Sequence, residues 1–172
     1  MTNVLDAKLR RITNGLTLSG GFLAWTTNAY DNASRLATVG NDTFTASYGY
    51  LANSALWGTL TFKQSGAARM TTTRQFDKLN RLLQVSAQPT GAPVSSAISY
   101  GYTYNDANRR TRATLTDGSY WVYQYDTLGQ VISGKKYWSD GTPVAGQQFE
   151  YAFDDIGNRT STKAGGDQAG AN

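Results

Sequence analysis

One short motif recurs along this chain and constrains its fold more than any other feature. An aromatic residue is followed usually by Asp, then by two variable residues, a small turn residue, and Arg or a polar substitute. Clear copies begin at residues 30, 76, 104, 125 and 153, and a weaker copy begins at residue 50. Such self-similarity predicts a repeat architecture, in which neighbouring copies bury surface against each other. The residues that we assign to this structural motif are Tyr30, Asp31, Arg35, Phe76, Asp77, Arg81, Tyr104, Arg109, Tyr125, Asp126, Gly129, Phe153, Asp154, Gly157 and Arg159.

The composition of the 172 residues excludes several kinds of active site and metal site. There is no His and no Cys, which excludes Ser-His-Asp and Cys-His catalysis and any zinc site built from these residues. Glu150 is the only glutamate among 12 acidic residues, and Asp favours turns whereas Glu favours helices. With 18 Gly, 11 Tyr and 4 Trp, the chain is predicted to be all-β. We expect no enzyme activity and no cofactor.

Alternating side chains precede the motif and predict strands. Trp121, Tyr123 and Tyr125 alternate with other residues, as in a strand with one buried face. The Asp or Asn after the aromatic can close an Asx-turn, and the small residue can adopt the left-handed conformation. Each copy then supplies two strands, so we expect an antiparallel meander of β-hairpins that forms a curved sheet or partial β-shell. Two-residue hairpins are predicted at Asn14-Gly15, Asp117-Gly118 and Asp140-Gly141.

Residues 1–172 are predicted to form a single repeat region. Residues 164–172 have no apolar pattern and are expected to be a loop, and no segment is apolar enough to be a membrane helix. Nothing obvious caps the first or last strand, although open sheet edges are normally protected. We therefore expect either a fragment of a longer strip or edges that pair with other copies of the chain.

The motif Tyr-Asp-x-x-Gly-Arg-Leu resembles the YD repeat of bacterial Rhs proteins. It is similar also to repeats in the B/C components of insecticidal Tc toxins and in animal teneurins. The resemblance runs from about Asn28 to Arg159, and Phe153–Arg159 matches a variant in which Asn and Arg follow the Gly. The copies that fit best are Tyr30-Asp31 with Arg35-Leu36, Phe76-Asp77 with Arg81-Leu82, and Tyr125-Asp126 with Gly129.

This resemblance implies a β-strip that spirals into a hollow shell around a toxic C-terminal domain. It implies secretion or a cell-surface location, and partners that are further repeats, other copies or an enclosed toxin polypeptide. The family's self-cleaving segment with paired aspartates and its variable toxin domain are not recognised in this sequence. The expected function is therefore a wall segment of such a shell, or a self-assembling cell-surface structure.

The basic residues allow two interpretations. Net charge is +4, and Arg35, Arg81, Arg109 and Arg159 could form a ladder for phosphates or acidic glycans. We favour the alternative, in which each Arg packs on an aromatic ring and pairs with a turn Asp or carbonyl. Strict alternation places Arg110 and Arg112 on one face, away from Arg109. A solvated face explains that cluster as well as a nucleic-acid patch does, and nucleic acid is not an expected partner.

The aromatic residues, the pair Asp154-Asp155 and the polar turns could each have a binding or catalytic function instead of a structural one. The aromatic residues could form a carbohydrate-binding platform, with Trp138 beside a turn as the best exposed ring, but a buried aromatic ladder is favoured. Asp154-Asp155 could share a proton for hydrolysis, yet Asp154 occupies the turn position of the motif. Turns rich in Asp, Asn and Gly could bind calcium, but none has a known ligand spacing, and no metal site is predicted.

Overall fold

The chain is all-β in the computed structural model, which describes residues 2–18, 21–91, 93 and 95–166. Among these residues the secondary structure consists of strands and turns, and no helix is long and apolar enough to cross a membrane. The strands are β1 (Thr2–Leu5), β2 (Arg11–Leu18), β3 (Gly21–Tyr30), β4 (Leu36–Gly40), β5 (Phe44–Tyr50), β6 (Trp57–Gln64), β7 (Ala67–Phe76), β8 (Leu82–Pro89), β9 (Ile98–Tyr104), β10 (Arg110–Thr114), β11 (Tyr120–Tyr125), β12 (Val131–Tyr137), β13 (Pro143–Phe153) and β14 (Arg159–Ala164).

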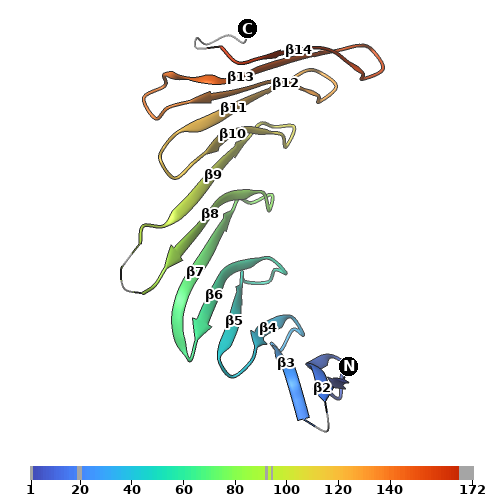
Figure 1. Ribbon diagram of the computed structural model, residues 1–172. Helices are drawn as coiled ribbons and strands as arrows, with labels where there is room; N and C mark the ends of the chain where they lie inside the picture. Colours follow the sequence, from blue (N-terminus) through green and yellow to red (C-terminus); the bar gives the residue numbers. More distant parts are fainter. Residues whose placement is uncertain (1, 19–20, 92, 94, 167–172) are drawn as a thin grey trace. The chain divides into compact units, whose positions relative to one another are not determined.

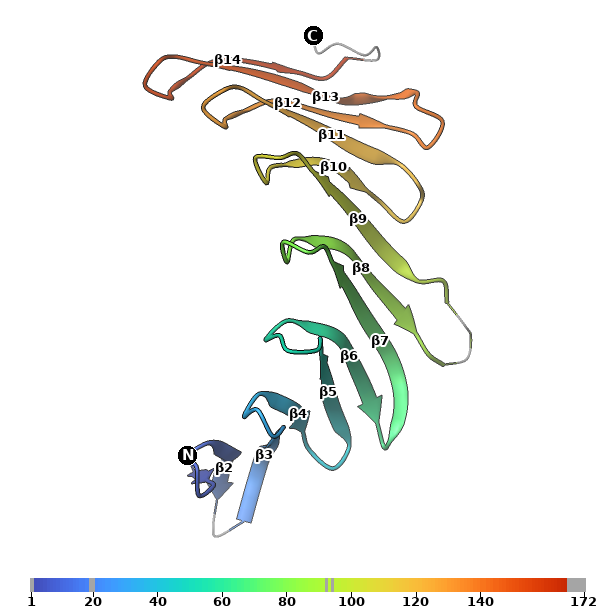
Figure 2. The same cartoon turned by 180° about the vertical axis from the view of Figure 1, so that it is seen from behind.

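The strands are hydrogen-bonded in sequence order from β1 to β14, and successive strands join as hairpins (Figures 1 and 2). Every pairing with an assigned register is antiparallel, which confirms the predicted meander. The chain divides into two compact units. Unit 1 comprises Met1–Gln75 and Ser86–Ala97, and unit 2 comprises Phe76–Val85 and Ile98–Asn172. A single repeat region over residues 1–172 stays a prediction.

The motif forms a hairpin loop that has the same hydrogen bonds in every copy except the one at residue 50. In the copy at residue 76, the amide of Asn80 donates to the carbonyl of Asp77, and the amide of Asp77 donates to the carbonyl of Arg81, both at 3.0 Å. The Asp77 carboxylate accepts the amide of Leu79 at 2.9 Å, which is the predicted Asx-turn. The left-handed residues of the predicted copies are Ser34, Asn53, Asn80, Asn108, Gly129 and Gly157, as expected except that Asn53 rather than Ser54 serves the copy at residue 50.

A β-bulge accompanies most of these loops. The register shifts beside the motif aromatic at Tyr30, Tyr50, Tyr125 and Phe153, so one extra residue on the following strand faces the aromatic. The bulge lies just beyond the loop, in the strand that follows it. A bulge reverses the alternation of side chains on its own strand, as it does between Arg110 and Arg112 of β10.

The prediction of a two-residue hairpin is wrong at all three sites. At Asp117-Gly118 and Asp140-Gly141 only the glycine has positive φ, whereas a type I′ turn requires two such residues. Both loops repeat the hydrogen bonds of the motif loop, as between the Gly118 amide and the Leu115 carbonyl at 3.0 Å. Asn14-Gly15 lies inside β2, with Gly15 opposite Trp25. The two-residue hairpin with two positive φ values is instead Ser65-Gly66.

The sheet has no buried hydrophobic side chain among the described residues. Its motif aromatics are half-buried, and Phe44 and Phe62 are 56% and 36% exposed. The predicted buried face and buried aromatic ladder are therefore wrong for the described part of the chain. Alternation reports the pleat of a strand, and it does not require a second layer to cover the apolar face. A loop is also predicted at residues 164–172. Ala164 is instead the last residue of β14, and residues 167–172 lie outside the described residues.

Candidate functional surface

Consecutive copies of the motif are joined by an arginine. In unit 2, Nε of Arg81 donates to its own Asp77 carboxylate at 2.6 Å, and its Nη1 donates to Asn108 Oδ1 of the next copy at 2.9 Å. The Arg81 guanidinium lies over the ring of Tyr104, 5.0 Å from the ring centroid. The Tyr104 hydroxyl donates back to the carbonyl of Leu82 at 2.8 Å. We call this pair of contacts, guanidinium on ring and hydroxyl to carbonyl, a rung.

The same rung recurs in both units. Arg10 lies 4.6 Å from the ring centroid of Tyr30, Arg35 lies 4.2 Å from that of Tyr50, and Arg109 lies 5.7 Å from that of Tyr125. In each case the tyrosine hydroxyl donates to the carbonyl of the residue after the arginine. Arg35, Arg81 and Arg109 make the contacts that the favoured interpretation predicts. These three bind rings and turn carbonyls or carboxylates, and Arg159 lies 4.7 Å from the centroid of Tyr151.

A further copy of the motif at residues 5–10 is absent from the sequence-based assignment. Asp6 pairs with Arg10 at 2.6 Å, and Leu9 has a φ of 60°. Leu5 stands where the other copies have an aromatic, and Leu9 stands where they have Gly, Asn or Ser. The spacing of Asp and Arg by four residues is the signal that could have revealed this copy.

The turn carboxylates are held in the charged state. The guanidinium and amide of Arg10 lower the pKa of Asp6, and the amide and guanidinium of Arg35 lower that of Asp31. Partial burial acts to raise the pKa of Asp77, but its hydrogen bonds to Arg81 outweigh burial and the pKa falls. These carboxylates are structural acceptors.

Asp154, the first of the paired acids Asp154 and Asp155, is held by hydrogen bonds within its own turn. The Asp154 carboxylate accepts the amide of Asn158 at 2.8 Å and its side-chain amide at 3.0 Å. These bonds lower the pKa of Asp154, whereas a general acid needs a raised one. The Asp154 carboxylate thus stabilises its own turn. Among the described residues there is also no group of three or more acidic side chains that could hold a metal ion.

Arg110 and Arg112 lie on opposite faces of the sheet, and the prediction that they share one face is wrong. The register of β10 against β9 shifts between them, which is a β-bulge. Arg110 lies 4.0 Å from the ring centroid of Tyr102, and Arg112 lies 3.4 Å from that of Tyr120. Tyr102 is opposite Ala113, the neighbour of Arg112, so Tyr102 and Arg112 point to different faces.

Aromatic rings line one face of unit 2. Trp121 stacks on Tyr123 with 6.4 Å between centroids and on Phe149 with 6.1 Å. These rings form the predicted ladder, but they are half-buried. Trp138 is 49% exposed beside its turn, and no aromatic ring of the described residues stacks on it. A sugar-binding platform needs a surface of rings rather than a single one, so Trp138 alone does not support it.

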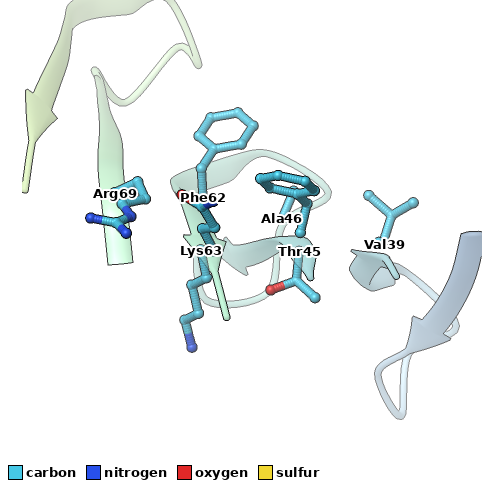
Figure 3. Close-up of a pocket in the computed structure, with 9 residues that line it drawn as sticks. Val39, Thr45, Ala46, Phe62, Lys63 and Arg69 are labelled. Carbon is cyan, nitrogen blue, oxygen red and sulfur yellow. The ribbon is translucent and has the colours of Figure 1, made fainter. Parts of the chain in front are cut away.

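An open groove of about 500 Å³ lies on unit 1 (Figure 3). Val39, Ala46 and Phe62 line it together with Phe44, and Lys63 and Arg69 stand at its margin. In Figure 3 the ring of Phe62 and the side chain of Lys63 point to opposite sides of their strand. Because two exposed phenylalanines meet here, the groove is an apolar surface that lacks a cover within unit 1.

A second groove, of about 370 Å³, lies on unit 2. It is lined by Tyr104, Asn108, Arg110, Tyr123, Tyr125 and Val131. Three tyrosine rings, one valine and one exposed arginine give it a mixed aromatic and cationic character, and no carboxylate lines it.

Solved structures share this fold. The crystal structure of TcdB2-TccC3-Cdc42 matches with a TM-score of 0.58 at 15% identity, over 93% of this chain and 7% of that one. The crystal structure of TcdB2-TccC3-TEV matches with a TM-score of 0.59 at 16% identity, over 90% of this chain and 8% of that one. The structure of the Photorhabdus luminescens Tc holotoxin pore matches with a TM-score of 0.58 at 16% identity, over 87% of this chain and 7% of that one.

These matches concern the fold. No family model and no curated protein matches the chain. The chain spans less than a tenth of the length of the solved chains that it matches. The resemblance of the motif to the repeats of Tc toxin components is thus confirmed as a shared all-β repeat fold.

Proposed function

We propose that this chain is a non-enzymatic structural module, a wall segment of an Rhs-type enclosing shell or of a self-assembling cell-surface structure. The observation that carries the proposal is the rung, because it joins four pairs of consecutive motif copies, through Arg10 and Tyr30, Arg35 and Tyr50, Arg81 and Tyr104, and Arg109 and Tyr125. A repeat held in this way can extend without a central core, since each copy needs only its neighbour.

The uncovered apolar surface supports the same function. Phe44 is 56% exposed in the groove of unit 1, and the described residues contain no buried hydrophobic side chain. Apolar surface of this kind marks sites of protein–protein contact. Its partners under this proposal are further repeats, other copies of the chain, or an enclosed toxin polypeptide. A secreted or cell-surface location follows from the same proposal.

Light scattering over a dilution series, with electron microscopy of the same samples, tests this function. The proposal predicts ordered particles that grow with concentration. Phe44→Ser, in the groove of unit 1, should weaken the association, whereas Leu79→Ser, on an exposed turn of unit 2, serves as a control of matched polarity. A chain that stays monomeric at every concentration would overturn the self-assembling form of the proposal.

A further inference from the structure

Arg110 is a cationic side chain beside a rung. The residue that follows the last position of the motif is apolar in some copies, as Leu36, Leu82 and Val131, and is an arginine in others, as Arg11, Arg110 and Arg159. The rung does not require this side chain, because Tyr125 bonds to the backbone carbonyl of Arg110. A cationic side chain that the rung does not need is a candidate for binding.

The guanidinium of Arg110 has open donors. It lies over the ring of Tyr102, and among the described residues it makes no hydrogen bond or ion pair. Arg110 is exposed and lines the groove of unit 2, which has no carboxylate. An arginine presents its N–H groups as a planar fork that fits a carboxylate with two parallel hydrogen bonds.

The walls of this groove are fixed and aromatic. The hydroxyl of Tyr125 donates to the carbonyl of Arg110 at 2.6 Å, and that of Tyr104 donates to the carbonyl of Leu82 at 2.8 Å. Both hydroxyls are engaged by the backbone, so these tyrosines offer their rings to the groove. Burial raises the pKa of Tyr123, and the positive charge of Arg110 opposes that rise, which places the charge near the third ring.

Asn108 contributes another donor. Its Oδ1 accepts a hydrogen bond from Arg81 at 2.9 Å, which fixes the orientation of the amide. Its Nδ2 then has no hydrogen-bond partner in the described part of the chain. The groove thus combines a forked cation, an amide donor and flat aromatic walls in about 370 Å³, a volume typical of small-ligand sites.

We propose that this groove binds a flat aromatic group that carries a carboxylate, with the carboxylate paired to Arg110 and the ring packed against Tyr104, Tyr123 and Tyr125. The charge of the ligand is complementary to the only ionised side chain that lines the groove. Such a ligand could be a free aromatic acid or the C-terminal aromatic residue of a polypeptide. The two sources share one chemistry and differ in the amide group beside the carboxylate.

Titration of the full ¹⁵N-labelled chain, followed by NMR, tests the proposal. The probes are 2-naphthoate for a free acid and N-acetyltryptophan for a chain end, each compared with its neutral carboxamide. We expect one acid or both to shift the Arg110 side-chain Nε–H signal and to bind at least about tenfold more tightly than the carboxamide, because a charge-assisted pair is lost in the amide. The tighter acid identifies the source.

Arg112 offers a matched control on the opposite face. Its guanidinium also lies over a tyrosine ring and makes no hydrogen bond or ion pair among the described residues. Arg110→Gln should weaken binding of the acid about tenfold, and Arg112→Gln should leave it unchanged. Equal losses in both variants, equal binding of acid and carboxamide, or no saturation below ~10 mM with either acid would overturn the proposal. The comparison of acid with amide uses the unchanged chain and does not depend on the folding of a variant.

Discussion

The hydroxyl of Tyr104 donates a hydrogen bond of 2.8 Å to the backbone carbonyl of Leu82, 22 residues earlier in the chain. The ring of the same tyrosine lies under the guanidinium of Arg81. One side chain thus binds the preceding motif copy by two different contacts. With no buried hydrophobic side chain among the described residues, contacts of this kind are expected to contribute a large share of the stability.

Tyr104→Phe should lower the free energy of unfolding by about 1 kcal/mol, because a hydrogen bond to a backbone carbonyl is lost while the ring remains. Urea unfolding followed by Trp fluorescence measures the change. Tyr100→Phe is the control, since the Tyr100 hydroxyl makes no hydrogen bond among the described residues and Tyr100 is 41% exposed. Equal effects of the two substitutions would contradict the assignment of the rung.

Leu9→Gly should raise the free energy of unfolding by about 1 kcal/mol. Leu9 has a φ of 60° and is 79% exposed, so glycine relieves backbone strain and gives up little apolar contact. Leu79→Gly provides the control, because Leu79 is 66% exposed on an equivalent turn but does not have positive φ. There glycine should lower the stability. Thermal melts of both variants measure these changes. A loss of stability in Leu9→Gly would contradict the assignment of residues 5–10 as a copy of the motif.

The copy at residue 125 has Gln130 in the arginine position, and the next copy has Phe153, which lacks a hydroxyl. The pair Gln130→Arg with Phe153→Tyr should complete a rung and raise the free energy of unfolding by about 1 kcal/mol. Gln130→Lys with Phe153→Tyr is the control, since an ammonium lacks the planar fork. Calorimetry should show a higher melting temperature for the first pair only. No gain over the lysine pair would show that the rung cannot be transferred.

Acid should weaken the fold through the turn aspartates. The pKa values of Asp6, Asp31 and Asp77 are lowered in the folded chain, so their stabilisation is complete above the unfolded value of about 3.9 and is lost as the pH falls through the folded values. Asp77→Asn should lower the melting temperature near neutral pH and reduce its fall below about pH 4.

Asp106→Asn is the control for this pH dependence, because the Asp106 carboxylate accepts no hydrogen bond among the described residues. At each pH in the acid range, the melting temperature of this variant should equal that of the unchanged chain. A melting curve of Asp77→Asn that keeps the full acid dependence of the unchanged chain would exclude the Asp77–Arg81 pair as its source.

The amino-acid sequence predicts the strands and most of the motif loops well because both have local causes, whereas it fails at the three two-residue hairpins. Alternating side chains define strands such as β11, and Asp77 and Asn80 bring the geometry of their own turn. The copy at residues 5–10 escapes this reasoning because Leu9 adopts a backbone conformation that leucine normally avoids. Contacts with Tyr30 and Ser34 hold Arg10, and these depend on strands that are distant in sequence.

Two other features could not be read from the sequence. The bulge between Arg110 and Arg112 depends on the register of β10 against β9, so strict alternation placed both side chains on one face. The lack of a covering layer is also invisible to alternation, since Trp121 and Tyr123 would follow the same pattern against a second sheet. The groove of unit 2 depends on both features and emerges only from the structure.

A double-mutant cycle between Arg81 and Tyr104 tests the central claim, that motif copies stabilise one another through the rung. The free energy of unfolding is measured for the unchanged chain, Arg81→Met, Tyr104→Leu and the double variant. The rung predicts a coupling free energy of at least about 0.5 kcal/mol, from the loss of the guanidinium–ring contact. Additive effects of the two substitutions would contradict the claim.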